Sequence, residues 1–70
     1  MNYILRAKVG AHDYYLRFEQ NGDEINPDAN ELKGLKNNAT VFYDQSVAAQ
    51  ALFRIKDRSI WPIDIIPHHP

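Results

Sequence analysis

The stretch FYDQSVAAQALFRIKDR, residues 42–58, decides the fold, because it carries the clearest helical pattern in the chain. Asp44 is a suitable N-cap, whose side-chain oxygen can accept the amide hydrogen of Ser46 or Val47. At about 100° per residue, five apolar side chains gather on one face of the predicted helix: Val47, Ala48, Ala51, Leu52 and Ile55. This stripe predicts a helix that covers one face of a sheet.

The segments before the helix predict an antiparallel hairpin. Residues 3–9 and residues 14–20 each alternate apolar and polar side chains, which is the period of a half-buried strand. Between the second strand and a short return at residues 24–25, Asn21-Gly22 is a strong two-residue turn signal.

The middle and the end of the chain are less regular. Asn26-Pro27-Asp28 offers an N-cap, a proline at the first helical position and an early acid, so residues 27–33 are expected to form a turn or two of helix, with an irregular loop as the alternative. Residues 40–43 are β-branched and aromatic enough for a short strand, and residues 62–66 predict a final strand with Pro62 at its start or edge.

Together these elements predict a small α+β fold of the order ββ(β)αβ, an antiparallel sheet of three to four strands with one helix packed on one face. We expect a single domain over residues 1–67 and a flexible C-terminal tail over residues 68–70. A chain of 70 residues buries only about 60% of the surface that its unfolded form exposes, so the core is thin.

Composition excludes several classes of function. The chain has no cysteine, which removes disulfides, thiolate metal sites and thiol nucleophiles and favours a cytoplasmic setting. We expect no signal peptide and no membrane span, because residues 1–9 alternate and no segment reaches the roughly 20 apolar residues that a bilayer requires. The net charge of −1 gives no overall attraction for nucleic acid or an anionic membrane.

The candidate chemistries are incomplete. His12 and Asp13 lack a nucleophile placed to complete a catalytic set, so we expect no enzymatic activity. His68 and His69, even with Asp64 or His12, lack the fixed spacing of a structural metal site. The glycines stand apart from one another and form no phosphate-binding loop. We therefore expect no catalytic residue, no metal and no cofactor.

One candidate surface is the outward face of the first hairpin. It is expected to display cations together with an aromatic ring, as sheets that bind single-stranded nucleic acid do: Arg6, Lys8, Tyr15 and Arg17. Glu19 lies beside them, and the cations at the end of the helix are explained by the helix dipole. Nucleic-acid binding is therefore the alternative function.

The second candidate surface is the outer side of the helix. Phe53 lies roughly 150° from the centre of the apolar stripe, where an exposed ring next to cations has the composition of a binding hot spot. The expected partner-binding residues are Phe53, Lys56, Ala49 and Arg54. The alternative is that residues 26–38 fold back over Phe53, or that the helix has a different phase.

The order of a polar hairpin, a short F-Y-D entry and the alanine-rich FYDQSVAAQAL before a final apolar strand resembles small ββαβ proteins of bacteriophages and mobile elements, among them some anti-CRISPR proteins. The resemblance covers most of the chain in outline and implies a stand-alone protein that occupies a surface of something larger. We therefore expect a non-enzymatic interaction module that binds a protein or nucleoprotein partner and inhibits or adapts it.

Overall fold

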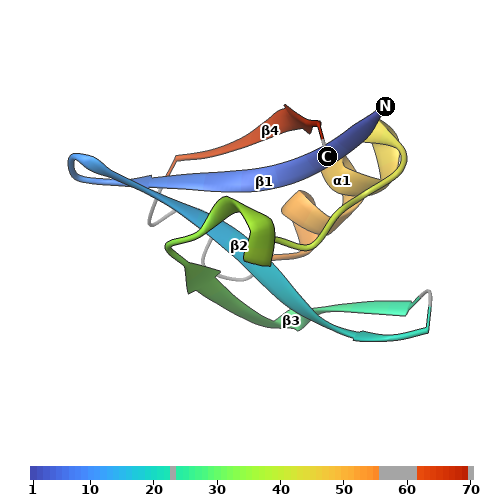
Figure 1. The fold of residues 1–70 in the computed structure, drawn as a ribbon. Helices are drawn as coiled ribbons and strands as arrows, with labels where there is room; N and C mark the ends of the chain where they lie inside the picture. The colour runs from blue at the N-terminus through green and yellow to red at the C-terminus, as the bar shows by residue number, and fades with distance from the viewer. Residues whose placement is uncertain (23, 56–61, 70) are drawn as a thin grey trace.

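The computed structural model describes residues 1–22, 24–55 and 62–69, apart from the side chains of Pro27 and Asp28. Over these residues the chain forms an antiparallel sheet with a single α-helix on one face (Figure 1), which confirms the predicted α+β class. The elements follow one another as β1 (Asn2–Val9), β2 (His12–Asn21), β3 (Glu24–Lys33), the 3₁₀ turn η1 (Lys36–Asn38), α1 (Gln45–Arg54) and β4 (Ile63–His68).

The strands lie in the order β3-β2-β1-β4, so that β1 is central and the chain returns after α1 to pair with it. Tight turns join β1 to β2 and β2 to β3. Gly10 and Gly22 adopt positive φ of 63° and 62° in these turns, a conformation that glycine reaches without steric cost. The second turn is displaced by one position from the prediction, because Asn21 still belongs to β2 and pairs with Glu24.

The predicted helix over residues 27–33 is wrong, because these residues belong to β3. The ladder between β2 and β3 is regular from the Tyr15–Lys33 pair to the Phe18–Asn30 pair and resumes with Glu19 and Asn26. Residues 27–29 therefore form a bulge, where the missing N–H of Pro27 breaks no ladder hydrogen bond. Pairing with β2 outweighs the local helix-start signal.

Residues 39–42 pass between β1 and β2 where these two strands separate. The Thr40 N–H donates to the Leu16 carbonyl (3.0 Å), and the Thr40 hydroxyl accepts from the Phe18 N–H (2.8 Å). Phe42 exchanges both backbone hydrogen bonds with Tyr3 (2.7 and 2.8 Å). The short strand predicted over residues 40–43 is thus reduced to a single bridge, at Phe42.

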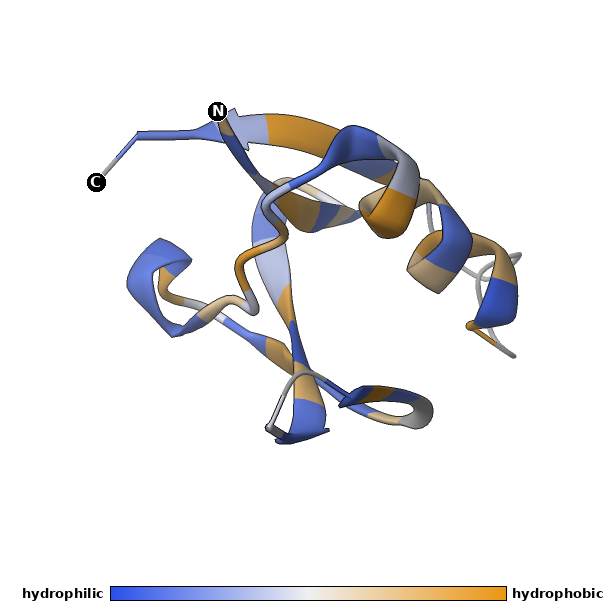
Figure 2. Cartoon of the chain, turned by 90° about the vertical axis from the view of Figure 1, so that its right-hand side faces the viewer, coloured by the Kyte–Doolittle hydropathy of each residue, from blue (hydrophilic) through white to orange (hydrophobic). Residues whose placement is uncertain are grey.

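The main core lies between the sheet and α1. It contains seven buried side chains: Leu5, Leu16, Phe18, Phe42, Ala48, Ala51 and Ile55. The rings of Phe18 and Phe42 meet edge to face, with centroids 5.9 Å apart. Figure 2 shows apolar and polar segments alternating along the strands beside α1, as expected for a sheet with one covered face.

Helix α1 begins as predicted, with the Asp44 side chain accepting the Ser46 N–H at 2.9 Å. Ala48, Ala51 and Ile55 are buried and Leu52 is half-buried against the core, but Val47 is 45% exposed. The covered stripe is therefore narrower than predicted, because it is centred between Ala48 and Ala51 and leaves Val47 at its rim. The predicted helical residues 56–58 lie outside the described residues.

Strand β4 continues further than predicted. His68, which the sequence assigned to a flexible tail, belongs to β4 and pairs with Asn2. The cause is β1, which is extended from Asn2 onward and offers a partner over the full length of β4. The two termini consequently lie at the same end of the sheet (Figure 1).

Candidate interaction surfaces

The outer side of α1 carries the residues predicted to bind a partner. Phe53 is 70% exposed, Arg54 is exposed and Ala49 is half-buried, and we call these three residues the Phe53 surface. The predicted phase is correct here, because Ala48 and Ala51 occupy the covered side of the same helix. Lys56, the fourth predicted residue, lies outside the described residues.

Two further apolar side chains are exposed near the start of α1. Tyr43, which precedes the N-cap, is 82% exposed, and Val47 is exposed one helical turn into α1. Sequence reasoning missed both, since it assigned Val47 to the core and Tyr43 to a strand. The exposure of Tyr43 could have been suspected from its position before the N-cap Asp44. Tyr43 lies outside the helix, where the helical period does not predict which side chains are buried.

The end of α1 borders a hollow of about 590 Å³ at the β2–β3 turn. Its walls are mostly polar: Glu19, Asn21, Glu24, Ile25, Asn26 and Arg54. The Arg54 guanidinium thus shares the hollow with two carboxylates, from Glu19 and Glu24. The Phe53 surface therefore ends at a hollow that contains both signs of charge.

The four residues of the predicted nucleic-acid face do lie together, on the sheet face opposite α1, which we call the open face. Arg6 pairs with Tyr15 across β1 and β2, and Tyr15 pairs in turn with Lys33 on β3. On the other side of β1, Arg6 pairs with Asp64 of β4. One row of partners thus crosses all four strands, with an acid at one end and a lysine at the other.

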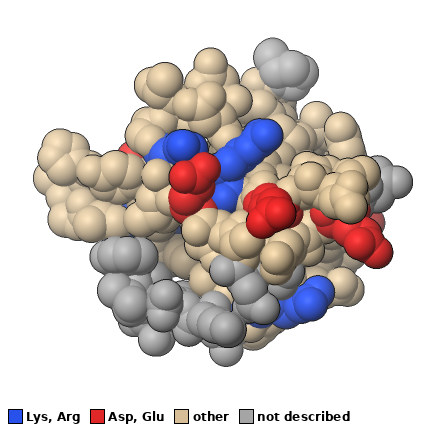
Figure 3. All heavy atoms as spheres, turned by 90° about the horizontal axis from the view of Figure 1, so that it is seen from below, with Lys and Arg blue, Asp and Glu red and all other residues tan. Residues whose placement is uncertain are grey.

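Each of the three cations of the predicted nucleic-acid face lies opposite a carboxylate on a neighbouring strand. Arg6 approaches Asp64 to 3.3 Å, Lys8 is the partner of Asp13 in the ladder, and Arg17 is the partner of Glu31. Glu31 also forms an ion pair with Lys33 (3.2 Å). Viewed from the β3 side (Figure 3), Lys and Arg side chains lie next to Asp and Glu side chains, so that neither sign forms a continuous patch.

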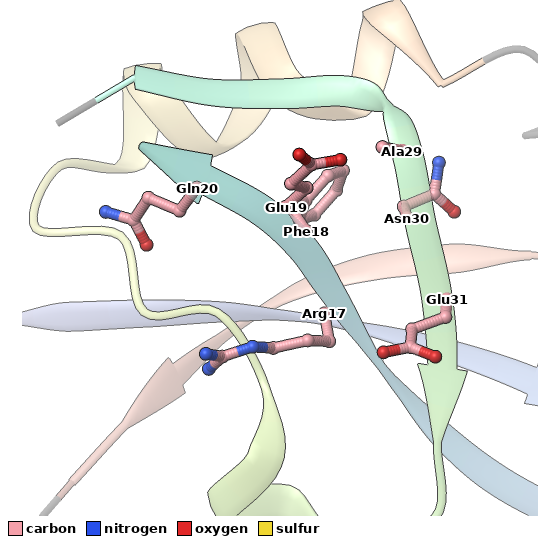
Figure 4. A pocket seen from close by; sticks show the side chains of 7 residues that line it. All are labelled: Arg17, Phe18, Glu19, Gln20, Ala29, Asn30 and Glu31. Carbon is pink, nitrogen blue, oxygen red and sulfur yellow. The ribbon is translucent and has the colours of Figure 1, made fainter. Parts of the chain in front are cut away.

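The bulge in β3 opens a second hollow, of about 500 Å³. Figure 4 shows β3 bending sharply near Ala29, with Phe18 and Glu19 of β2 directed into the bend. The Glu31 carboxylate extends from β3 toward β2, whereas the Arg17 side chain extends across β2 to the other side. The side chains of the hollow offer mixed charge and no convergent set of catalytic groups.

His12 lies apart from the adjacent His68 and His69 in the fold. His12 begins β2 at the β1–β2 turn, whereas His68 lies in β4 opposite Asn2. Within residues 1–22, 24–55 and 62–69, no group of three or more His, Cys, Asp or Glu side chains is placed to hold a metal ion. In the same part of the chain, no helix has the length and hydropathy needed to span a membrane.

Among the described residues, Asp44 has a perturbed pKa. The backbone N–H and the hydroxyl of Ser46 both donate to the Asp44 carboxylate at 2.9 Å, and these bonds lower the pKa of Asp44 below its usual value of 3.8. The cause is the helix cap, so the shift reports local structure and not a reactive site. A comparison of the chain with protein-family models, curated proteins and solved structures found no match.

Proposed function

We propose that this protein is a non-enzymatic interaction module that binds a larger protein or nucleoprotein partner through the Phe53 surface and inhibits or adapts it. The single observation that carries the proposal is the 70% exposure of Phe53 in a chain of 70 residues. A small domain gains stability from every large ring that it buries. An outward phenylalanine gives up that stabilisation of the folded state, and binding to a partner offsets the loss.

The chemistry around Phe53 fits a protein partner. Arg54 lies next to it in sequence, and aromatic side chains with arginine dominate binding hot spots. Ala49 leaves space beside the ring, one helical turn before it. Tyr43 and Val47 are further exposed apolar side chains near the start of α1.

Nucleic-acid binding through Arg6, Lys8, Tyr15 and Arg17 is the second candidate. Its support is the grouping of these residues on the open face. The carboxylates opposite Arg6, Lys8 and Arg17 oppose it, because a phosphate backbone would meet Asp64, Asp13 and Glu31 at the same positions. Together with the net charge of −1, this arrangement favours a protein partner.

The outline resemblance to small phage and mobile-element proteins gives the proposal its biological setting. In that setting the module acts in the cytoplasm of a bacterial host as an anti-CRISPR-like inhibitor or a related accessory protein, without a cofactor. The absence of cysteine agrees with a reducing compartment.

Affinity capture from bacterial lysate, with and without nuclease, tests the proposal. The wild type is compared with Phe53→Ala and with the matched control Gln50→Ala, a polar exposed residue of the same helix. We expect a captured protein that survives nuclease, is lost with Phe53→Ala and is kept with Gln50→Ala. The affinity for the purified partner should fall at least about 30-fold for Phe53→Ala, as for a hot-spot residue.

Thermal melting separates binding from folding. Phe53→Ala should change the free energy of unfolding by less than about 1 kcal/mol, as substitutions at exposed sites do. If Phe53→Ala unfolds the domain, the ring belongs to the core and the proposal fails. Capture that disappears with nuclease and is abolished by Arg17→Ala, but not by Phe53→Ala, would favour the nucleic-acid function instead.

A further inference from the structure

Strand β4 forms one edge of the sheet, and its register with β1 determines which backbone groups point outward. The Lys8 N–H donates to the Pro62 carbonyl at 3.1 Å, in the same register as the Arg6–Asp64 and Ile4–Ile66 pairs. In an antiparallel ladder, hydrogen-bonded and non-hydrogen-bonded pairs alternate. The backbone groups of Asp64, Ile66 and His68 therefore face β1.

The remaining residues of β4 direct their backbone groups away from β1. Ile63 and Ile65 each present an N–H and a carbonyl to the outer edge, and Pro67 presents a carbonyl alone. Within the described residues, no other strand pairs with this side of β4. The edge can therefore accept a further strand, although Pro67 offers no N–H for pairing. Proline is one of the residues by which proteins limit pairing at exposed edges.

The side chains of β4 divide between the two faces of the sheet. Ile63 and Ile65 are half-buried on the side of α1, where they pack against the core. Asp64, Ile66 and His68 alternate with them on the open face. On this face of β4 the side chains follow in the order acid, apolar, imidazole. A second β4 that runs antiparallel can therefore place its imidazole opposite the acid.

We propose that a second copy of this chain pairs its β4 with this edge, antiparallel about a twofold axis at Ile66. In this register Asp64 lies opposite His68 of the second copy, and the two Ile66 side chains meet between these pairs. The Ile65 N–H donates to the Pro67 carbonyl of the second copy, and Ile63 exchanges backbone hydrogen bonds with its His69. The two sheets become one continuous sheet.

Two neighbouring registers are less favourable. A twofold axis at Asp64 sets the two Asp64 carboxylates directly opposite each other, and like charges in this position destabilise a strand pair. An axis at Ile65 sets Asp64 opposite Ile66, which leaves the carboxylate beside an apolar side chain. Of these three registers, the axis at Ile66 is the one that sets the carboxylate opposite an imidazole, and its pairs lie within residues 63–69.

His68 has a feature that agrees with such a contact. Its Nδ1 atom is buried and has no hydrogen-bond partner among the described residues. Nδ1 is therefore not available to a second copy, and contact with Asp64 of that copy is assigned to Nε2. On its own chain, Asp64 is 53% exposed and remains accessible next to Arg6.

The contact is small, because it joins single strands, and it is expected to be weak. Standard interfaces bury about 1,600 Å², more than one edge strand provides. The association constant must therefore be measured by sedimentation equilibrium on the full chain at concentrations up to about 1 mM. We expect a reversible monomer–dimer equilibrium in that range.

Charge exchange tests the register. His68→Asp sets two carboxylates opposite each other, and Asp64→His sets two imidazoles opposite each other, so each change should weaken the dimer at least about 10-fold. The double variant Asp64→His with His68→Asp restores an unlike pair and should recover most of the affinity. Phe53→Ala, on a different surface, should leave the equilibrium unchanged.

The outcomes are decisive in both directions. A wild type that remains monomeric at about 1 mM overturns the proposal, as does a folded double variant that dimerises no better than the single variants. Loss of the dimer with Phe53→Ala and not with Asp64→His would assign self-association to α1 instead. Circular-dichroism melting identifies variants that fail to fold. Asp64→His, at an exposed position, keeps the test valid if His68→Asp does not fold.

Discussion

On the face of the sheet that α1 covers, Leu5, Leu16 and Phe18 are almost completely buried, whereas the open face displays Arg6, Lys8 and Arg17 opposite carboxylates. The covered face is stabilised by the removal of apolar surface from water, which is worth roughly 25 cal/mol per Å². The open face carries exposed ion pairs, whose median contribution is about 0 to 1 kcal/mol, together with Ile4, which is fully buried on that face. The main core cluster therefore lies on one side of the strands, and most of the charged surface lies on the other.

Phe18→Ala should break the covered face with the largest effect. The ring is 2% exposed and meets Phe42 edge to face, so its removal leaves a cavity that the small core cannot close. We expect a loss of about 3 to 5 kcal/mol in the free energy of unfolding, which is most of the stability of a small domain.

Urea denaturation followed by circular dichroism measures this loss. Phe18→Leu, which retains much of the volume, is the control and should cost less. A midpoint for Phe18→Ala that stays close to the wild type would mean that Phe18 does not belong to the core.

Thr40→Val tests the segment over residues 39–42 that passes between β1 and β2, where the covered face depends on a polar group. Thr40 is 2% exposed, and its hydroxyl accepts the buried Phe18 N–H at 2.8 Å. Valine has the same shape but leaves that N–H without its partner, so we expect a loss of about 1 to 3 kcal/mol.

Thr40→Ser retains the hydroxyl and removes one methyl group, so it should cost about 1 kcal/mol or less. The same urea titration compares the two variants. Equal stability of the valine and serine variants would show that the hydroxyl is not needed at this position.

Much of this arrangement could be predicted from local sequence patterns. The alternation in β1 and β2 and the exposure of Phe53 follow from periods of two and 3.6 residues, and the N-cap follows from the side-chain oxygen of Asp44. All three are found. Residues 27–33 could not be predicted, because the helix-start signal at Asn26 and Pro27 is local and pairing with β2 is not. Val47 was predicted to be buried but is exposed, because the helical pattern in the sequence does not show how much of the helix surface the sheet covers.

For the candidate surfaces too, the local pattern could be predicted and the pairing between strands could not. Membership of the open face follows from alternation, so Arg6, Lys8, Tyr15 and Arg17 were grouped correctly. Their carboxylate partners could not be found, because the Arg6–Asp64 pair depends on register between β1 and β4, which are distant in sequence, and the Arg17–Glu31 pair depends on β3, which was predicted to be helical at Glu31. With these carboxylate partners, the open face is a surface of balanced charge and not a basic patch.

Asp44 provides a pH-dependent contribution at the start of α1. Its pKa is lowered by the hydrogen bonds from Ser46, so the stabilisation is complete above the ordinary value of 3.8 and is lost as the pH falls through the lower pKa of the folded state. The wild type should therefore lose stability relative to Asp44→Asn on acidification, since asparagine also caps helices but does not titrate.

Urea midpoints of both proteins, measured from about pH 5 down to about pH 2, give this difference directly. A difference between wild type and Asp44→Asn that stays constant over the whole range would show that the charge of Asp44 does not matter for the cap.

The smallest expected effect is the coupling between Arg6 and Asp64 on the open face. Their side chains are 26% and 53% exposed, so water screens the ion pair at 3.3 Å and the coupling energy should stay below about 1 kcal/mol. A double-mutant cycle with Arg6→Ala and Asp64→Ala, measured by urea denaturation, isolates this term from the lost packing of the arginine stem.

The Glu31–Lys33 pair, at 3.2 Å with 62% and 39% exposure, is the matched control and should couple no more strongly. Both couplings should decrease at high salt. A salt-resistant Arg6–Asp64 coupling above about 2 kcal/mol would mean that the open face stabilises the fold as the covered face does, and the two faces would no longer differ in kind.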